Sequence, residues 1–165
     1  ELTIALHRIF DFSKDKLIFD VGHQCYTHKI LTGRKLDTLR KKDGVSGFQK
    51  IGESIYDCYE AGHSSTSISA ANGFAISRDL KKENYNVVAF IGDGAINSGL
   101  ALEGLNNIAH SEHKIIVILN DNGMSISKPV GGLSKMFDNI STSRGYNRIK
   151  RKYQNFFSKT IIMMI

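Results

Sequence analysis

The sequence predicts an α/β fold, a doubly wound and mostly parallel sheet, from two apolar runs and the helix between them. NVVAFIG at 86–92 and KIIVILN at 114–120 are continuously apolar, which is typical of strands that are covered on both faces. The segment 100–110 has the length and apolar spacing of a crossover helix, which parallel strands require. Each run ends in a small polar cluster, GDG after the first and NDN after the second.

The rest of the chain adds further helices and a strand, in this order. Residues 2–10 have helical spacing, and 16–21 form a short apolar run that suits a buried strand. A helix is predicted around 36–42, followed by a long irregular segment. Residues 62–84 predict a helix that begins at GHSS, whose hydroxyl groups suit a cap, and that packs small residues on its buried side. After position 122, glycine and serine predict a loop with a short helix.

Composition and charge are those of an ordinary globular chain with a basic end. Of the 165 residues, 41% are hydrophobic and 23% are charged. Six of the 22 basic residues and none of the 16 acidic residues lie after position 140, so the net charge of +6 belongs to this end. We expect an α/β domain over 1–140, truncated at its N-terminal side, and a partly disordered basic tail over 141–165. A run of cations is more typical of a solvated face or a linker than of a nucleic-acid site, so nucleic acid is not expected as a partner.

The two cysteines and the absence of long apolar runs indicate the compartment. Cys25 and Cys58 stand alone, without the spacing of a zinc site or a redox pair, and suit small buried hydrophobes in a reducing environment. No apolar run has the roughly 18 residues of a membrane helix. We predict a cytoplasmic protein without a membrane partner. The chain opens with glutamate within a predicted helix, which indicates a fragment.

The two polar clusters predict one ligand site. Because the carboxyl ends of parallel strands meet at one edge of a sheet, Asp93 of GDG and Asn122 of NDN are expected side by side. Carboxylate and amide oxygens are ligands that Mg²⁺ prefers, and phosphate oxygens usually complete its shell. Gly92 and Gly94 allow the backbone to approach a ligand closely, and the helix that follows is expected to point free N–H groups at an anion. The pattern predicts a metal and diphosphate site.

Two other phosphate motifs fit these residues less well. A P-loop needs a lysine and a hydroxyl residue after its second glycine, but Leu100 and Ala101 follow Gly99. A dinucleotide fingerprint needs a third glycine where Asn97 stands. An NAD-binding Rossmann domain and a non-catalytic phosphate-binding module stay as alternatives, the second with the basic tail as its binding segment.

GDG followed by NDN resembles the signature of thiamin diphosphate enzymes. FDVGHQCYTHKILTGR, YEAGHSSTSISAANG, IGDGAINSGLALEGLNN and ILNDNGMSIS occur in one order and resemble the 1-deoxy-D-xylulose-5-phosphate synthase family, from position 1 to about position 148. The resemblance implies the thiamin diphosphate-binding fold, incomplete in this chain. Transketolases and 2-oxoacid dehydrogenase-type enzymes are the alternatives within the thiamin group, and the stretches GHSSTS and VGHQCYTHK favour the synthase.

The same resemblance implies a set of site residues, motif by motif. Asp93 and Asn122 would bind Mg²⁺ by their side chains, and Met124 would bind it by its carbonyl oxygen. His23 of VGHQ corresponds to an active-site histidine that approaches both cofactor and substrate, and it is the catalytic candidate. The implied contacts with the thiamin diphosphate cofactor come from His23, Gly62, His63, Ser64, Gly94, Ala95 and Asn122.

The resemblance also implies a reaction and its partners. The family joins pyruvate to glyceraldehyde 3-phosphate with loss of carbon dioxide, and its product leads to isoprenoids, thiamin and pyridoxal. A homodimer is implied, in the cytoplasm or in the plastid of a plant-type relative. The family's pyrimidine-binding domain and an earlier N-terminal segment are missing here, so the isolated chain is expected to be inactive. Gln49 stands where relatives often carry proline, which predicts a looser loop.

The remaining polar residues are expected to be structural. A solvated face is predicted for Lys29, Arg34 and the run Arg40–Lys42, although these cations could attract a phosphorylated substrate. Surface or packing positions are predicted for His7, His28, His110 and His113. Glu103 and Asn106 are expected to fix the crossover helix to the sheet or to help subunits pack.

Overall fold

The computed structural model describes residues 2–120, together with residues 132, 135, 136, 139, 142, 143, 145, 147 and 148. The chain divides into two units, Glu1–Ser125 and Ile126–Ile165, and the helices and strands described below belong to the first. The predicted boundary at position 140 between a domain and a basic tail stays a prediction. Within the described residues, no helix is both long enough and apolar enough to cross a membrane.

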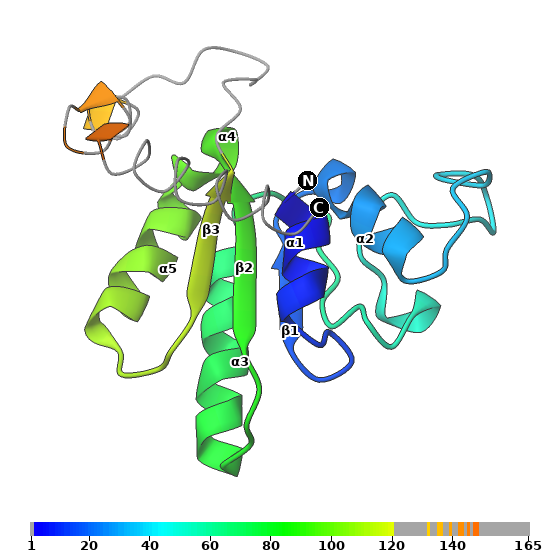
Figure 1. The fold of residues 1–165 in the computed structure, drawn as a ribbon, viewed down its shortest axis with the longest axis horizontal. Coiled ribbons are helices and arrows are strands. Elements are labelled where there is room, and N and C mark those ends of the chain that lie inside the picture. The colour runs from blue at the N-terminus through cyan, green and yellow to red at the C-terminus, as the bar shows by residue number, and fades with distance from the viewer. Residues whose placement is uncertain are drawn as a thin grey trace, which may run out of the picture. The chain divides into compact units, whose positions relative to one another are not determined.

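In the first unit, parallel strands alternate with helices (Figure 1). The elements are, in chain order, α1 (Leu2–Ile9), β1 (Lys16–Phe19), the 3₁₀ helix η1 (Gly22–Cys25), α2 (Tyr26–Leu31), the 3₁₀ helix η2 (Ile51–Glu53), α3 (Ser67–Lys81), β2 (Val87–Gly92), α4 (Asp93–Ile96), α5 (Gly99–His110) and β3 (Ile116–Asn120). These bounds confirm the three predicted strands, the N-terminal helix, the helix after GHSS and the crossover helix.

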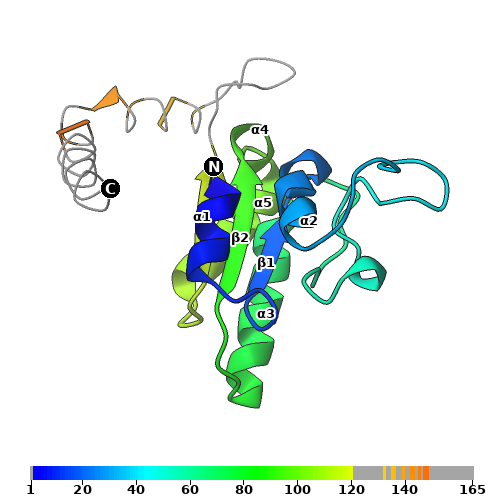
Figure 2. The ribbon, with the colours of Figure 1, turned by 45° about the vertical axis from the view of Figure 1, so that its right-hand side comes forward.

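The three strands form one parallel sheet in the order β1-β2-β3. Lys16 of β1 pairs with Val87 of β2 at one end, and Gly92 of β2 pairs with Asn120 of β3 at the other. All carboxyl ends therefore lie at one edge of the sheet. The single turn of α4 follows directly from the tip of β2 at this edge (Figure 2).

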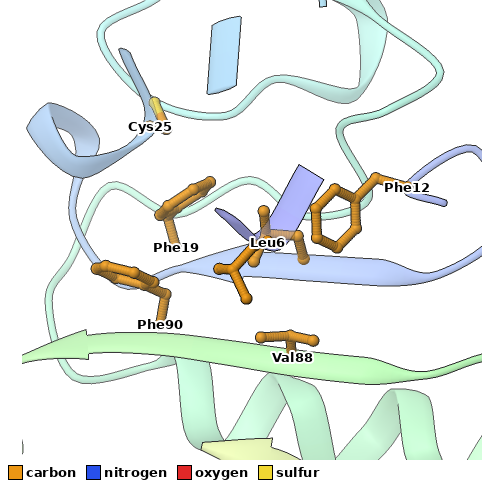
Figure 3. Packing of buried hydrophobic residues seen from close by; sticks show 7 residues of the cluster. Leu6, Phe12, Phe19, Cys25, Val88 and Phe90 are labelled. Atoms are coloured by element: carbon orange, nitrogen blue, oxygen red, sulfur yellow. The ribbon is translucent and has the colours of Figure 1, made fainter. Parts of the chain in front are cut away.

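One face of β1 and β2 packs against α1 in an apolar core (Figure 3). Because side chains alternate between the two faces of a strand, every second residue of β1 and β2 joins this cluster. Its members are Leu6, Phe12, Leu17, Phe19, Cys25, Val88 and Phe90. Each large side chain buried in this way stabilises the fold by about 1.5–3 kcal/mol.

The opposite face of β1 and β2 is covered by α3, and α5 packs against α3. The buried side of α3 carries Ile68, Ala71 and Ala75, all fully buried. A Cβ atom added to Gly104 of α5 would lie 3.0 Å from Ile68 Cγ2, so the glycine lets the two helices approach closely. The small residues predicted for this helix face are confirmed, as is the doubly wound arrangement with helices on both faces.

Two local predictions for the segment between α2 and α3 are wrong. Residues 36–42 form turns rather than a helix, and Arg40 adopts a positive φ of 60°, which a right-handed helix does not allow. Gln49 does not loosen its loop. Its buried amide accepts a hydrogen bond from the Phe19 amide at 3.0 Å and donates one to the Leu17 carbonyl at 2.9 Å. Gln49 thereby provides hydrogen-bond partners for two backbone groups at the unpaired edge of β1.

The exposure of α5 and β3 also differs from the prediction. Glu103 and Asn106 are exposed, which excludes a role in fixing α5 to the sheet and leaves only the predicted role in subunit packing. The Asn72 amide of α3 donates to Asn107 Oδ1 of α5 at 2.6 Å and joins the two helices. β3 is apolar from Ile116 to Leu119 but only partly buried, and Ile116 is 39% exposed, whereas every residue of β2 is buried.

Candidate functional site

Three chain segments meet at the carboxyl edge of the sheet. Asp20 follows β1 directly, the GHSS loop over 62–66 leads into α3, and the GDGA turn over 92–95 follows β2. The hydrogen bonds of Asp20 and Ser65 link all three. The backbone amide of Asp20 donates to the Phe90 carbonyl of β2 at 2.9 Å, which continues the strand pairing past the end of β1.

The carboxylate of Asp20 closes the N-terminal end of α3. It is 1% exposed, and it accepts hydrogen bonds from the Ser65 amide at 2.5 Å, from the Ser67 amide at 3.1 Å and from the Ser67 hydroxyl at 2.7 Å. The residue before α3, Thr66, makes no side-chain cap. The prediction that hydroxyl groups of GHSS cap this helix is therefore wrong, because a carboxylate from a distant strand takes that role. The sequence signal for it is the aspartate that directly follows an apolar run.

Ser65 connects the GHSS loop to the GDGA turn. Its hydroxyl donates to the Ala95 carbonyl at 2.8 Å. Its backbone has a φ of 74°, a conformation that residues other than glycine adopt infrequently. The predicted cofactor residues of the two motifs are thus brought together through a serine that the sequence analysis did not single out.

The GDGA turn presents Asp93 at the start of α4. Asp93 is half-buried, and within the described part of the chain no hydrogen bond or ion pair engages its carboxylate. Its carbonyl accepts from the Asn97 side-chain amide at 3.0 Å, which holds the turn closed. A partly buried carboxylate without a protein partner can serve as a ligand for a cation.

Two helices follow GDG, and the second of them is the crossover helix predicted over 100–110. α4 is a single turn, and the crossover helix α5 begins only at Gly99, where the Ser98 hydroxyl accepts from the Ala101 amide at 3.4 Å. The N-terminal end of α5 is capped within its own segment. The Ser98 hydroxyl takes one amide of this first turn, and the prediction that the helix after GDG points free N–H groups at an anion stays a prediction.

His23 and its neighbours lie beyond the tip of β1. His23 is exposed in η1, and Gly22 before it is buried. A Cβ atom on Gly92 would lie 3.2 Å from Gln24 Nε2, so the amide of Gln24 lies over the tip of β2. The segment after β1 therefore reaches the GDGA turn.

The other predicted residues are placed as follows. Gly62 and His63 are exposed, Ser64 is half-buried, and His63 Nδ1 lies 2.9 Å from the Ser64 carbonyl. Gly94 is exposed, and Ala95 is half-buried.

Asn122 and Met124 lie outside the described residues. Asn120, which pairs with Gly92 across the β2–β3 ladder, places the start of NDN beside GDG. Among the described residues, no group of three or more histidine, cysteine, aspartate or glutamate side chains is arranged to hold a metal.

A buried charge cluster lies on the α2 side of the sheet, where a solvated face was predicted. Lys29 is fully buried and contacts Glu53 at 2.7 Å, and the guanidinium of Arg34 forms a two-point ion pair with Asp57. His28, also fully buried, contacts Asp57 at 3.0 Å. The prediction is wrong for Lys29 and Arg34 and holds for the exposed run Arg40–Lys42. Partners 23 to 29 residues away supply the cluster, so no local pattern could have shown it.

Burial disfavours the thiolate form of both cysteines. Cys25 is fully buried in the core, and its sulfur lies 2.9 Å from the Gly22 carbonyl. Burial raises the pKa of both Cys25 and Cys58 to about 11, so both stay as thiols at neutral pH. The predicted role as a small buried group is confirmed for Cys25, whereas Cys58 is only half-buried.

A parallel sheet whose carboxyl edge joins a serine-rich loop, a glycine-rich turn and a carboxylate with no partner among the described residues is typical of α/β proteins that bind ligands at the strand tips. The family model described as 1-deoxy-D-xylulose-5-phosphate synthase matches residues 1–165, and the chain belongs to this family.

Three relatives show the extent of the similarity. The chain is 54% identical over 164 residues to the 1-deoxy-D-xylulose-5-phosphate synthase of Clostridium acetobutylicum, which covers 98% of the chain and 26% of that relative. It is 56% identical over 161 residues to the proteins of the same name from Clostridium tetani and Macrococcus caseolyticus, each alignment covering 96% of the chain and 26% of the relative. The chain thus spans about a quarter of the length of the curated relatives it matches. The alternatives of a transketolase, an NAD-binding domain or a phosphate-binding module are not favoured.

Proposed function

We propose that this chain forms the Mg²⁺ and diphosphate side of a thiamin diphosphate site in a 1-deoxy-D-xylulose-5-phosphate synthase. The observation that carries the proposal is the hydrogen bond from the Ser65 hydroxyl to the Ala95 carbonyl. It joins the two motifs from which cofactor contacts are expected, at the sheet edge where α/β proteins bind ligands. Family membership supports the same assignment.

The residues at this edge of the sheet are chemically suited to Mg²⁺ and to the thiamin diphosphate cofactor. The Asp93 carboxylate is half-buried at the strand tip and has no protein partner among the described residues, as a Mg²⁺ ligand requires. With it, the Asn122 side chain and the Met124 carbonyl are the proposed metal ligands. Contacts with the cofactor are proposed for Gly62, His63, Ser64, Gly94, Ala95 and Asn122.

His23 is the proposed catalytic residue. It is exposed in the segment that follows β1 and reaches the GDGA turn, so its imidazole can donate or accept a hydrogen bond at the reacting groups. When bound, thiamin diphosphate supplies the carbon nucleophile for joining pyruvate to glyceraldehyde 3-phosphate. The chain's own part is to hold the diphosphate, orient it through the metal and keep the loops around it in place.

The substrates, a homodimeric assembly and a cytoplasmic location are part of the same proposal. The exposed α5 residues Glu103 and Asn106 leave that helix face open to a second subunit. The two unpaired cysteines and the bacterial relatives support a reducing compartment.

Calorimetry with thiamin diphosphate tests the proposal. We expect binding that requires Mg²⁺ and that Asp93→Ala weakens by about tenfold or more, since a metal ligand is lost. Asp37→Ala, which removes an exposed carboxylate from a turn, is the matched control and should bind as the unmodified chain does. Binding that is the same without Mg²⁺, or the same in Asp93→Ala, would refute the assignment.

A further inference from the structure

We infer that Asp20 is a positioning residue whose buried carboxylate holds the GHSS loop against the GDGA turn before any ligand binds. The inference deepens the proposed function and rests on it for what the two segments bind. It concerns a residue outside the motif positions assigned to metal and cofactor, and it explains how those positions are brought together.

The backbone of Asp20 is fixed by the sheet. Its amide donates to the Phe90 carbonyl of β2 at 2.9 Å, so the residue continues the β1–β2 pairing. The side chain is 1% exposed. A carboxylate held in this way on a rigid strand is a fixed reference point for the loops that contact it.

The groups that face this carboxylate are all hydrogen-bond donors. They are the Ser65 amide at 2.5 Å, the Ser67 amide at 3.1 Å and the Ser67 hydroxyl at 2.7 Å. No cation contacts Asp20 within the described part of the chain, so the N-terminal end of α3 provides the compensating positive charge. Asp20 thus occupies the Ser65 and Ser67 amides, and the cofactor contacts proposed for this segment lie in the loop before α3.

Ser65 transmits the position of Asp20 to the turn after β2. Its positive φ of 74° persists only where the surrounding structure holds it. The carboxylate of Asp20 holds the Ser65 amide on one side, and the Ala95 carbonyl holds its hydroxyl on the other. Loss of the first contact releases the loop conformation that makes the second, which separates the two cofactor-contact segments.

Three variants separate positioning from simple helix capping. Asp20→Asn keeps the shape but places an NH₂ group against backbone N–H donors in either orientation of the amide. Ser65→Ala removes the link to Ala95 and leaves the contact between the Ser65 amide and Asp20. Ser67→Ala is the matched control, because it removes a hydrogen bond to the same carboxylate on the helix side only.

Hydrogen exchange of the ligand-free chain is the first measurement. We expect Asp20→Asn and Ser65→Ala to raise amide exchange in the segment 93–98 by about tenfold, and Ser67→Ala to leave it unchanged. Unchanged exchange in 93–98 in both Asp20→Asn and Ser65→Ala would overturn the inference and leave Asp20 as a helix cap. If Asp20→Asn also raises exchange throughout β2, it has unfolded the chain, and Ser65→Ala alone decides.

Calorimetric titration with thiamin diphosphate and Mg²⁺ is the second measurement. We expect Asp20→Asn and Ser65→Ala each to raise the Kd by about tenfold, and the double variant to raise it no further, because both act through one contact. Effects that multiply in the double variant, or an equal loss in Ser67→Ala, would contradict the inference. A chain that binds no thiamin diphosphate but shows the coupled exchange would refute the proposed function and leave the inference standing.

Discussion

Replacing Asp57 with asparagine removes a carboxylate whose side chain is fully buried in the charge cluster between α2 and the loop over 46–57. Its oxygens accept hydrogen bonds from the His28 ring at 3.0 Å and the Lys50 backbone amide at 3.0 Å, and both terminal nitrogens of Arg34 contact it. The amide of asparagine has nearly the same shape, so the change removes charge and one acceptor without opening a cavity.

The expected cost follows from the groups left behind. Arg34, with its side chain 10% exposed, and the fully buried Lys29 then share one carboxylate, that of Glu53. These two cations then face one carboxylate, so one positive charge lacks its partner. Removing one partner of a buried ion pair costs about 3–5 kcal/mol for this reason. Set against a total free energy of unfolding of roughly 5–15 kcal/mol for a domain, this is a large fraction.

Urea unfolding followed by circular dichroism measures the effect, since the chain has no tryptophan. With a slope of about 2 kcal/mol per molar urea, the midpoint should fall by roughly 1.5–2.5 M. Asp37→Asn, in an exposed turn, is the control and should change the free energy of unfolding by less than about 0.5 kcal/mol. A midpoint that falls no further in Asp57→Asn than in the control would refute the stabilising role of this carboxylate.

The same site predicts how stability depends on pH. Burial disfavours the charged form of Asp57, but hydrogen bonds from His28, Arg34 and the Lys50 amide outweigh it and hold the pKa well below its ordinary 3.8. The unfolded chain therefore binds a proton that the folded chain does not, so stability is lost as the pH falls through about 4. Asp57→Asn should flatten this part of the curve. The pKa of His7 is also lowered, first by burial and then by the charge of His28. Its contribution to stability is therefore lost from a higher pH, as the pH falls below its ordinary pKa of 6.5.

Three packing predictions accompany the first. Gln49→Leu leaves the buried Phe19 amide without its partner and leaves the Leu17 carbonyl with only the Cys58 thiol at 3.5 Å. It should cost about 1–3 kcal/mol, and unchanged amide exchange along β1 would contradict this. Gly22→Ala places a Cβ atom against the Gly47 carbonyl oxygen and should lower stability by about 1–3 kcal/mol, measured by urea unfolding. An unfolding midpoint equal to that of the unmodified chain would argue against close packing of Gly22 on Gly47. Gly104→Leu should force α5 away from Ile68 and lower the thermal midpoint more than Gly104→Ala does, and equal midpoints would show that the helices are not closely packed there.

Some residues of the candidate site could be predicted from local sequence motifs. GDG and NDN follow two apolar runs, and a parallel sheet places such strand ends together whatever the rest of the chain does. Asp93 and its turn could therefore be predicted from the sequence, and the pairing of Gly92 with Asn120 agrees with it. Asn122 and Met124 stay predictions that rest on the family resemblance.

Asp20 and Ser65 could not be assigned in the same way. An aspartate after a strand has many ordinary uses, and the donors that define its role here lie 45 and 47 residues further along the chain. The positive φ of Ser65 is likewise invisible in the sequence, because a serine in a polar loop usually adopts an ordinary conformation. Their role depends on the sheet holding β1 beside β2.

The sequence by itself determined the strands, most helices and the meeting of GDG and NDN at one edge of the sheet, because these follow from apolar periodicity and from the geometry of parallel strands. Only the tertiary structure decided which charged side chains are buried and which partners they have. Lys29 and Arg34 resemble surface cations in the sequence, and they are buried because Glu53 and Asp57 reach them from a distant loop. A charge enters a protein interior only with a partner, and the choice of partner is a property of the fold rather than of neighbouring residues.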